Sequence, residues 1–471
     1  MNTIHEKKIV FCVALAAFTF QFEAFMVSVS LPNMASEMAA STTSISFVVL
    51  TYLLAASIAF LPAGHLANRF GLRCVFLSGC LIALVATLVC GISQSLVVLC
   101  VGRFAQGLGT GAMVAMGYAM IPMYVGQGRV GWGYGMLSLG AGLGMLTGLP
   151  AGGALAYLLS WNWIFIGTAP LFGLLLYVGF KQLPRGHCNK SLSDVDNPID
   201  WTGLLLGSLL ISSTVLSFSL GAELGWTSVI IVSLLSLSIL LGGLLILRAR
   251  RGKSLVSPFL LRNPEFVFSI AILFSFNFVN SGLRFLMPFY LEYGFGLSVL
   301  LSSILLLAYS VGFAATSTWS GPLTDRFSPF FIVRTALLLT AIICTLYAWL
   351  ISVNELILCL CFMLILGITT ALFSPANNRL IASSVKSDER AEASALIPIA
   401  LNMGSLVGVS AFDTIFSLDF PEQAGMSLQG RPVADVAAQH LQLGLSHALV
   451  LAALILWFTL FMTKRFVRSW R

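Results

Sequence analysis

Long apolar stretches alternate with short polar connections along almost the whole chain. A helix that crosses the hydrocarbon core of a bilayer needs about 20 apolar residues, and each stretch is close to that length. The pattern therefore predicts fourteen membrane-spanning helices, near residues 9–30, 45–64, 74–93, 96–118, 131–157, 163–181, 201–221, 227–247, 266–289, 298–319, 331–352, 355–376, 393–418 and 443–463.

The composition supports an all-α integral membrane protein. Hydrophobic residues make up 58% of the chain and charged residues only 9%, whereas a soluble domain carries about 25% charged residues. The first apolar stretch has the length of a full span and no small-residue cleavage site behind a short core. A removable signal peptide is therefore not expected.

Basic residues are distributed very unevenly between the two predicted sides of the membrane. Twenty-two Lys and Arg residues fall on the side of the termini, and only Arg431 falls on the other side. Because cytoplasmic loops carry the excess of basic residues, both termini are expected in the cytoplasm of a multi-pass protein of the inner (cytoplasmic) membrane. The net charge of +7 is then explained by topology and by contact with anionic lipid, and no nucleic-acid partner is predicted.

The reactive residue types form no recognisable catalytic or metal-binding group. The nine cysteines lie mostly inside apolar stretches and make no C-x-x-C, and the five histidines lie at segment ends without forming a ligand cluster. No phosphate-binding loop of the G-x-x-x-x-G-K-[ST] type is present, so ATP is not expected to supply energy. We predict no metal, no cofactor and no enzymatic activity.

The last six predicted spans repeat features of the first six. G-H-L-A-N-R-F follows the second span at Gly64, and G-P-L-T-D-R-F follows the tenth span at Gly321. Parallel six-helix halves of this kind are typical of transporters that rock around a midplane site. We therefore expect an N-terminal six-helix bundle (1–190), two additional spans (191–255) and a C-terminal six-helix bundle (256–471).

Two charged residues lie at similar depth in different spans. Glu23 is roughly 21 Å from the cytoplasmic face and Arg103 is roughly 11 Å from the outer face, in a core about 30 Å thick. Since an acid at this depth is costly and usually functional, we predict that the two face a shared cavity and interact, with Glu23 coupling transport to protons. The alternative is a static pair that only orients two helices.

Polar and aromatic side chains within spans are candidates for a substrate cavity. A polar group in lipid needs a partner, so an inward orientation is favoured for Gln21, Tyr52, Gln106, Asn277 and Asn402. Phe278 and Phe285 lie seven residues apart in a Phe-rich span and could form an aromatic wall for a flat apolar ligand.

The stretch from Gly64 to Arg73 resembles the cytoplasmic loop signature of the major facilitator superfamily, G-x-L-A-D-R-x-G-R-R. In that family the loop latches the two halves together, which implies gating roles for the matching positions, although Asn68 replaces the family's Asp. The same resemblance implies that the spans carrying Arg284 and Asp413 are neighbours, and we predict that these two residues form an outer gate pair. The gating positions are Gly64, Asn68, Arg69, Gly71 and Arg73, with Asp325 and Arg326 in the second copy.

Other motifs narrow the resemblance to the fourteen-span drug:proton antiporters. The stretch from Val101 to Met113 is similar to the fourth-span motif R-x-x-Q-G-x-G, and Glu23 falls on the Asp of the first-span motif. The stretch from Gly142 to Gly153 is similar to the antiporter signature G-x-x-x-G-P-x-L-G-G, with its proline one residue late. It predicts a helix-packing role for Gly148, Pro150, Gly152 and Gly153.

The resemblance implies the major facilitator fold, with two six-helix bundles and two extra central helices. It also implies that the protein is a transporter. We expect a monomer that exports small organic molecules, such as drugs or toxic compounds, in exchange for protons by alternating access. The alternatives are a dedicated exporter of one endogenous metabolite, such as a siderophore, and a non-transporting sensor or scaffold.

Overall fold

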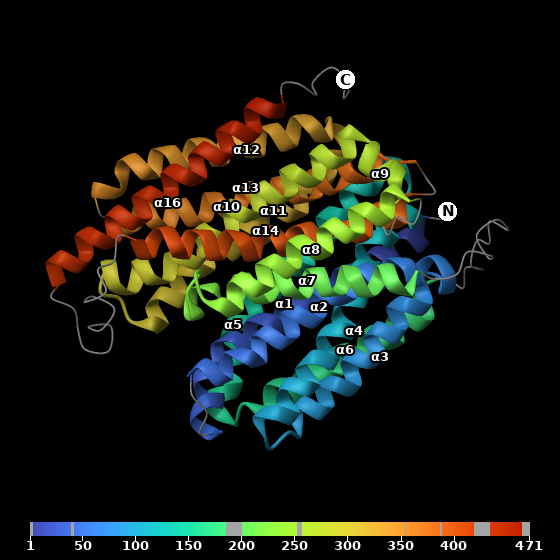
Figure 1. Cartoon of the computed structure of the whole chain (residues 1–471), viewed down its shortest axis with the longest axis horizontal. Helices are drawn as coiled ribbons and strands as arrows, with labels where there is room; N and C mark the ends of the chain where they lie inside the picture. The colour runs from blue at the N-terminus through green and yellow to red at the C-terminus, as the bar shows by residue number, and fades with distance from the viewer. Residues whose placement is uncertain are drawn as a thin grey trace.

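The computed structural model describes residues 3–38, 42–184, 200–251, 257–353, 355–386, 389–418 and 434–463. Within these ranges the fold is built from fourteen helices of 20 residues or more (Figure 1). They are α1 (Thr3–Glu37), α2 (Thr42–Phe70), α3 (Leu72–Gly91), α4 (Leu96–Tyr124), α5 (Val130–Leu158), α6 (Asn162–Gln182), α7 (Trp201–Leu224), α8 (Val229–Arg250), α10 (Pro264–Phe289), α11 (Val299–Arg326), α12 (Pro329–Leu350), α13 (Leu356–Ser383), α14 (Arg390–Leu418) and α16 (Ala434–Thr463).

Thirteen of the described helices are long and apolar enough to cross a membrane. The long helix outside this group is α5, which occupies the predicted 131–157 span and contains nine glycines. Shorter helical turns connect the long helices: η1 (Gln127–Arg129), α9 (Pro258–Arg262), η2 (Tyr290–Gly294) and η3 (Ile351–Val353). The predicted all-helical membrane architecture is confirmed.

Helices α1–α6, called here the N-half, pack in the same way as α10–α14 and α16, called the C-half. Helix α1 lies along α5 as α10 lies along α14, and α2 pairs with α4 as α11 pairs with α13. Helix α3 pairs with α6 as α12 pairs with α16. This repeated packing places the two copies of the G-x-L motif at equivalent helix ends.

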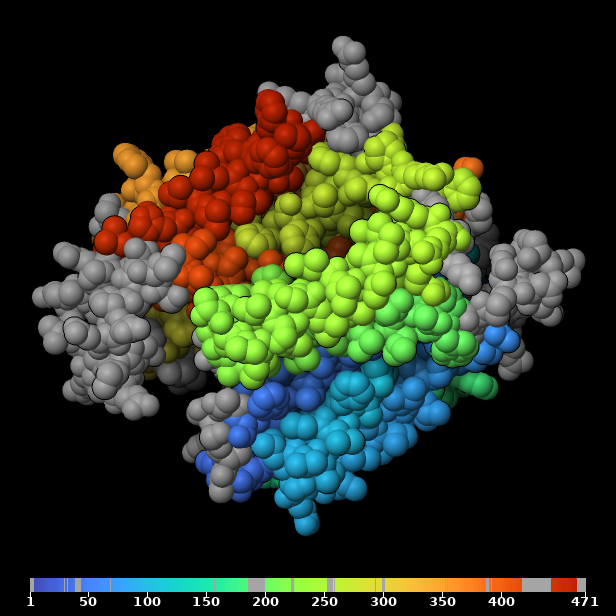
Figure 2. All heavy atoms as spheres, viewed as in Figure 1, coloured from blue at the N-terminus to red at the C-terminus, as the bar shows by residue number. Residues whose placement is uncertain are grey.

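Helices α7 and α8 lie across the junction between the two halves (Figure 2). Buried residues of α7, among them Leu204 and Ile211, pack with Leu61 of α2, and Leu396 and Met403 of α14 join the same apolar cluster. Helix α8 packs mainly on α7, and most of the exposed side chains on its remaining surface are Val, Ile and Leu. Such a surface is suited to lipid contact.

A row of glycines brings α5 very close to α1. A Cβ atom at Gly140, Gly144, Gly148 or Gly152 would lie 2.1–2.7 Å from a backbone oxygen of α1. The contacted oxygens belong to Ala14, Phe18, Phe22 and Met26, which follow the same four-residue spacing. The two helices therefore run in the same direction, turn against turn, with no room for side chains between them.

The predicted packing role fits only two of the four residues named from the sequence. Gly148 and Gly152 lie in this row, whereas the Pro150 side chain is exposed and Gly153 is half-buried. The reason is helical geometry, since residues four apart share a face and residues two apart point in nearly opposite directions. Gly140 and Gly144 were missed, although the four-residue spacing of the glycines could have revealed them.

The end of the bundle at which α1 begins is called the base. Because the long helices alternate in direction, α2 and α11 end at the base while α5 and α14 begin there. The two halves approach closely near this end, since Gly321 of α11 packs on Gly131 and Gly135 of α5, and Gly64 of α2 packs on Ala395 of α14. The ribbons of the two halves diverge with distance from the base (Figure 1).

Candidate functional site

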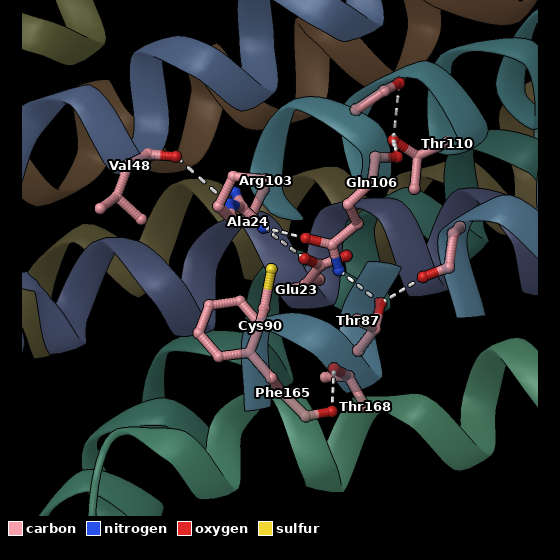
Figure 3. Close-up of polar contacts among 12 residues, drawn as sticks. Glu23, Ala24, Val48, Thr87, Cys90, Arg103, Gln106, Thr110, Phe165 and Thr168 are labelled. Atoms are coloured by element: carbon pink, nitrogen blue, oxygen red, sulfur yellow. Dashed lines mark hydrogen bonds and ion pairs between the residues drawn. The ribbon is translucent and has the colours of Figure 1, made fainter. Parts of the chain in front are cut away.

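Glu23 of α1 and Arg103 of α4 form an ion pair inside the N-half (Figure 3). The Arg103 guanidinium donates to Glu23 Oε1 over 2.5 Å, and the exposed fractions of the two side chains are 1% and 0%. The sequence predicted that the two residues lie at a common depth, and the observed contact agrees with that prediction. The charges are removed from solvent, so each depends on the other for compensation.

The surroundings hold the Arg103 guanidinium on several sides. It donates to the Val48 carbonyl oxygen over 3.2 Å and to Gln106 Oε1 over 2.7 Å, and the Tyr52 ring centroid lies 3.9 Å from its central carbon. By contrast, Glu23 Oε2 has no hydrogen-bond partner among the described residues. The carboxylate therefore keeps one oxygen that can receive a proton while the other remains on Arg103.

Tyr52 and Gln106 belong to this buried group, although the sequence predicted that they line the substrate cavity. Gln106 lies one turn after Arg103 on the same face of α4 and donates to Thr87 Oγ1 over 2.5 Å. Tyr52 is 1% exposed and covers the guanidinium. The prediction used only the polarity of these side chains. Polarity indicates that a side chain faces away from lipid, but it does not distinguish the interior of one half from the cavity between the halves.

A central cavity of about 250 Å³ lies between the two halves. Its lining includes Gln21, Asn277 and Asn402, three of the residues proposed for it from the sequence. The N-half contributes a mainly apolar wall, and the C-half contributes most of the polar groups. The polar residues of the C-half wall are Asn277, Asn280, Ser281, Arg284, Tyr309, Thr370, Ser374, Asn378, Asn402 and Ser405.

Glu23 and Arg103 are not among the residues that line this cavity, so the predicted shared cavity is not observed. Gln21 precedes Glu23 by two positions, which turns the two side chains to nearly opposite faces of α1. A chain of ring contacts nevertheless connects the two sites. Phe20 lines the cavity and stacks on Tyr52 with 6.0 Å between ring centroids, and Tyr52 in turn covers Arg103.

Phe278 and Phe285 do not line the described cavity. Phe278 packs on Phe274 and on Phe412 of α14, and Phe285 packs on Phe289. The cavity face of α10 instead carries its polar residues at positions 277, 280, 281 and 284. This spacing defines one helical stripe, and it could have identified Asn280 and Arg284 from the sequence.

Arg284 lies in the cavity lining, and the structure does not show the predicted gate pair with Asp413. The Arg284 guanidinium carbon lies 4.6 Å from the Tyr309 ring centroid. Among the ion pairs of the described residues, none includes Arg284 or Asp413. The ring of Phe412 faces Gly282 of α10, so the next residue, Asp413, is turned about 100° away from that helix.

A second polar group, called here the base latch, joins the halves. The Asp325 carboxylate at the end of α11 accepts hydrogen bonds from the backbone N–H groups of Gly131 and Trp132 over 2.8 and 2.7 Å. Arg379 of α13 lies 2.9 Å from the same carboxylate. A negative charge at the beginning of α5 is favourable because it compensates the unpaired N–H groups of that helix.

The other predicted gating positions have more local surroundings. Gly71 has φ +86°, which explains the glycine in the turn between α2 and α3. Arg73 donates to the Phe180 carbonyl oxygen within the N-half, and Arg69 and Arg326 are exposed. The side chain of Asn68, the counterpart of Asp325, lies outside what the structure describes.

The described residues contain no group of three or more His, Cys, Asp or Glu side chains that could hold a metal ion. The arrangement instead combines a cavity between two repeated halves, a buried ion pair beside it and a contact that closes the base. Together these features define a membrane transporter with two related bundles.

The chain belongs to the Major Facilitator Superfamily, whose family model matches residues 13–409. It is 29% identical over 300 residues to an uncharacterized MFS-type transporter of Mycobacterium tuberculosis (strain CDC 1551 / Oshkosh), in a match that covers 63% of this chain and 43% of that protein. The matched region is therefore less than half the length of that relative. The family and these relatives indicate a transporter and not an enzyme.

Two further relatives carry more specific names. The multidrug resistance protein Stp of the same strain is 26% identical over 66% of this chain and 58% of its own length. The riboflavin transporter RibZ of Clostridioides difficile (strain 630) is 22% identical over 86% and 87% of the two chains. A solved structure of the proton:xylose symporter XylE has a TM-score of 0.66 at 14% identity and covers 97% of this chain and 96% of its own, which supports the fold alone.

Proposed function

We propose that this protein exports small organic molecules across the cytoplasmic membrane in exchange for protons, with Glu23 as the proton-binding group. The observation that carries the proposal is the fully buried Glu23 carboxylate, with one oxygen on Arg103 and the other without a partner among the described residues. Such a group has two distinct states, paired with the cation or neutralised by a proton.

Protonation of Glu23 changes the balance of charge around Arg103. Removing one member of a buried ion pair costs about 3–5 kcal/mol, because the remaining charge is left without compensation. Arg103 must then turn further toward the Val48 carbonyl oxygen and Gln106 or find another acceptor. A proton can therefore favour one arrangement of α1 and α4 over another, which is what exchange by alternating access requires.

The ring contacts supply a route between substrate and proton. A ligand in the central cavity would touch Phe20, and any displacement of that ring would alter its stacking on Tyr52. Tyr52 lies directly over the Arg103 guanidinium. We infer that substrate binding and Glu23 protonation influence each other through these three side chains although Glu23 does not face the cavity.

The name of the relative Stp supports export of drugs or other toxic compounds. A second candidate is transport of one particular metabolite, and a specific observation favours it. The C-half wall of the cavity is rich in amide and hydroxyl groups, several of them held by one another, and fixed polar partners are typical of a site for a single substrate. The name of the relative RibZ supports this second candidate.

The experiment compares Glu23→Gln, Glu23→Asp and wild type. Expressing cells are grown against a wide panel of toxic compounds, and compounds that wild type protects against are added to purified protein while released protons are measured. Glu23→Gln is expected to abolish both protection and proton release, and Glu23→Asp to retain part of each. Glu6→Gln is the matched control, since Glu6 lies on the same helix and pairs with Arg129 at the base.

The outcomes separate the candidates. Protection against chemically diverse compounds supports multidrug export, and protection against one compound supports the second candidate. Proton release that continues unchanged in Glu23→Gln would show that the coupling role assigned to this residue is wrong.

A further inference from the structure

The charge of the central cavity is set by one residue. Among the described residues that line it, Arg284 is the single charged side chain, and no Asp or Glu accompanies it. Arg284 is partly buried, and neither an ion pair nor a hydrogen bond joins its guanidinium to any residue that the structure describes. Among the described residues, the face of the Tyr309 ring lies 4.6 Å from the Arg284 guanidinium carbon.

Two other arginines of the transmembrane bundle have a carboxylate partner. Arg103 is paired with Glu23 and Arg379 with Asp325. A cation within the membrane normally faces a partner of opposite charge or a pathway, because leaving it uncompensated is costly. Arg284 has no such partner in the part of the chain described, so its compensation is expected to come from what enters the cavity.

The Tyr309 ring beneath Arg284 is held in place by its neighbours. The Tyr309 hydroxyl donates to Asn280 Oδ1 over 3.2 Å, and the Asn280 side-chain amide donates to Thr370 Oγ1 over 2.5 Å. The ring occupies one face of the guanidinium, whose N–H groups point outward in its plane. A planar edge of donors is therefore available for a carboxylate or sulfonate, which it can bind with two parallel hydrogen bonds.

The opposite wall of the cavity has a different character. The N-half contributes Val13, Ala16, Phe20, Leu137 and Met145, with Gln21, Ser138 and Tyr118 as its polar members. A ligand that spans the cavity would thus meet an apolar surface on one side and Arg284 with its amide and hydroxyl neighbours on the other.

We propose that the central cavity binds amphipathic organic anions, with the anionic group on Arg284 and the apolar body against the N-half wall. This proposal rests on the proposed function in treating the cavity as the substrate site, and it narrows the substrate to one charge class. It differs from a general multidrug site, which would accept neutral and cationic compounds equally well.

The test measures binding to detergent-purified full-length protein by equilibrium dialysis of radiolabelled compounds that share an apolar body and carry an anionic, uncharged or cationic polar group. One series is naphthalene-2-sulfonate, naphthalene-2-sulfonamide and 2-naphthylmethylammonium. The other is 4-phenylbutanoate, its amide and 4-phenylbutylammonium. The anion of each series is expected to bind at least about tenfold more tightly than its uncharged analogue, since hydrogen bonds to charged groups stabilise more than neutral ones.

Variants of Arg284 assign the preference to this residue. Arg284→Gln is expected to weaken anion binding about 10- to 100-fold and to leave the uncharged amides almost unchanged, whereas Arg284→Lys keeps part of the preference. Arg262→Gln is the matched control, because Arg262 is exposed on α9, away from the cavity lining. Unchanged binding of the amides also shows that Arg284→Gln has kept its fold.

Three results would overturn the proposal: neither anion binds, the ammonium or amide compounds bind as tightly as the anions, or Arg284→Gln keeps the anion preference. The proton-release assay with Glu23→Gln distinguishes this failure from failure of the proposed function. Proton release coupled to neutral or cationic compounds would retain export and reject an anion site. Anion binding that depends on Arg284 without any proton release would support the site and reject proton-coupled export.

Discussion

The base latch offers the sharpest test of how the two halves are held together. In the Asp325→Asn variant, the carboxylate that accepts from two N–H groups of α5 becomes an amide with a single acceptor oxygen. Its NH₂ group then faces a donor, and Arg379 loses its negatively charged partner. The variant keeps the size and shape of the side chain, so its effect reports charge and hydrogen bonding.

The magnitude follows from the contacts that are lost. A hydrogen bond to a charged group contributes about 1.5–3 kcal/mol, and a charge at a helix N-terminus contributes about 0.3–1 kcal/mol. The closed base should therefore lose about 2–4 kcal/mol. This corresponds to a change of about 30- to 700-fold in the ratio of closed to open base.

Amide hydrogen exchange measures this ratio directly. Peptides covering residues 130–136 should exchange faster in Asp325→Asn by up to a factor in that range. The N–H groups of Gly131 and Trp132 lie in the first turn of α5 and have Asp325 as their acceptor, so they are exposed whenever the base opens. Peptides covering residues 148–156, near the other end of α5, should exchange at the wild-type rate. A change confined to the base separates local opening from general unfolding.

Arg326→Gln is the control for loss of charge near the same helix end, since Arg326 is exposed, and it should exchange like wild type. The reasoning is refuted if peptides 130–136 exchange equally fast in Asp325→Asn and wild type. It is also refuted if peptides 148–156 accelerate in Asp325→Asn as much as peptides 130–136 do.

Three further predictions concern packing, coupling and pH. Gly148→Ala should lower the melting temperature, because overpacking costs about 1–3 kcal/mol where a Cβ would lie 2.6 Å from a backbone oxygen; Gly173→Ala, with nothing within 4 Å, should not. Phe20→Ala should reduce proton release per bound substrate much more than it reduces substrate affinity, as measured by parallel dialysis and pH recording. Burial raises the pKa of Asp200, but the Gly203 N–H and Arg248 lower it more, so the net pKa is below its usual value. The carboxylate thus stabilises the fold above its unfolded pKa of about 3.9 and loses this effect as the pH falls through the lower folded value. Asp200→Asn should therefore reduce the melting temperature slightly at pH 7, and the reduction should shrink as the pH falls below about 3.9.

The fold could be predicted from the sequence because span length and loop charge are properties of single segments. Each apolar stretch had to be long enough to cross a membrane, and the all-helical class and the family were confirmed. The same reasoning also identified α5 as a span, although α5 is not among the thirteen candidate spans of the described helices.

Contacts in the candidate site could be predicted from the sequence only where the depth of a residue in the membrane determined which side chains meet. Glu23 and Arg103 could be matched because both lie at a common level, and the structure joins them at 2.5 Å. Direction around a helix was harder, since Phe278 and Asn277 are neighbours in sequence yet only Asn277 lines the cavity. The direction of the Asp413 side chain depends on the rotation of α14 about its own axis relative to α10. A single sequence does not determine that rotation.

The glycine row on α5 has a mechanical consequence. Gly131 and Trp132 at one end of this helix are held by Asp325, and Gly148, about 25 Å further along, is pressed against Phe22, the residue before Glu23. Backbone meshed with backbone leaves no compressible side-chain layer between α5 and α1. Helix α5 is therefore expected to move as a rigid rod. A tilt of α5 that follows opening of the base would shift the segment of α1 that carries Glu23 by a corresponding amount.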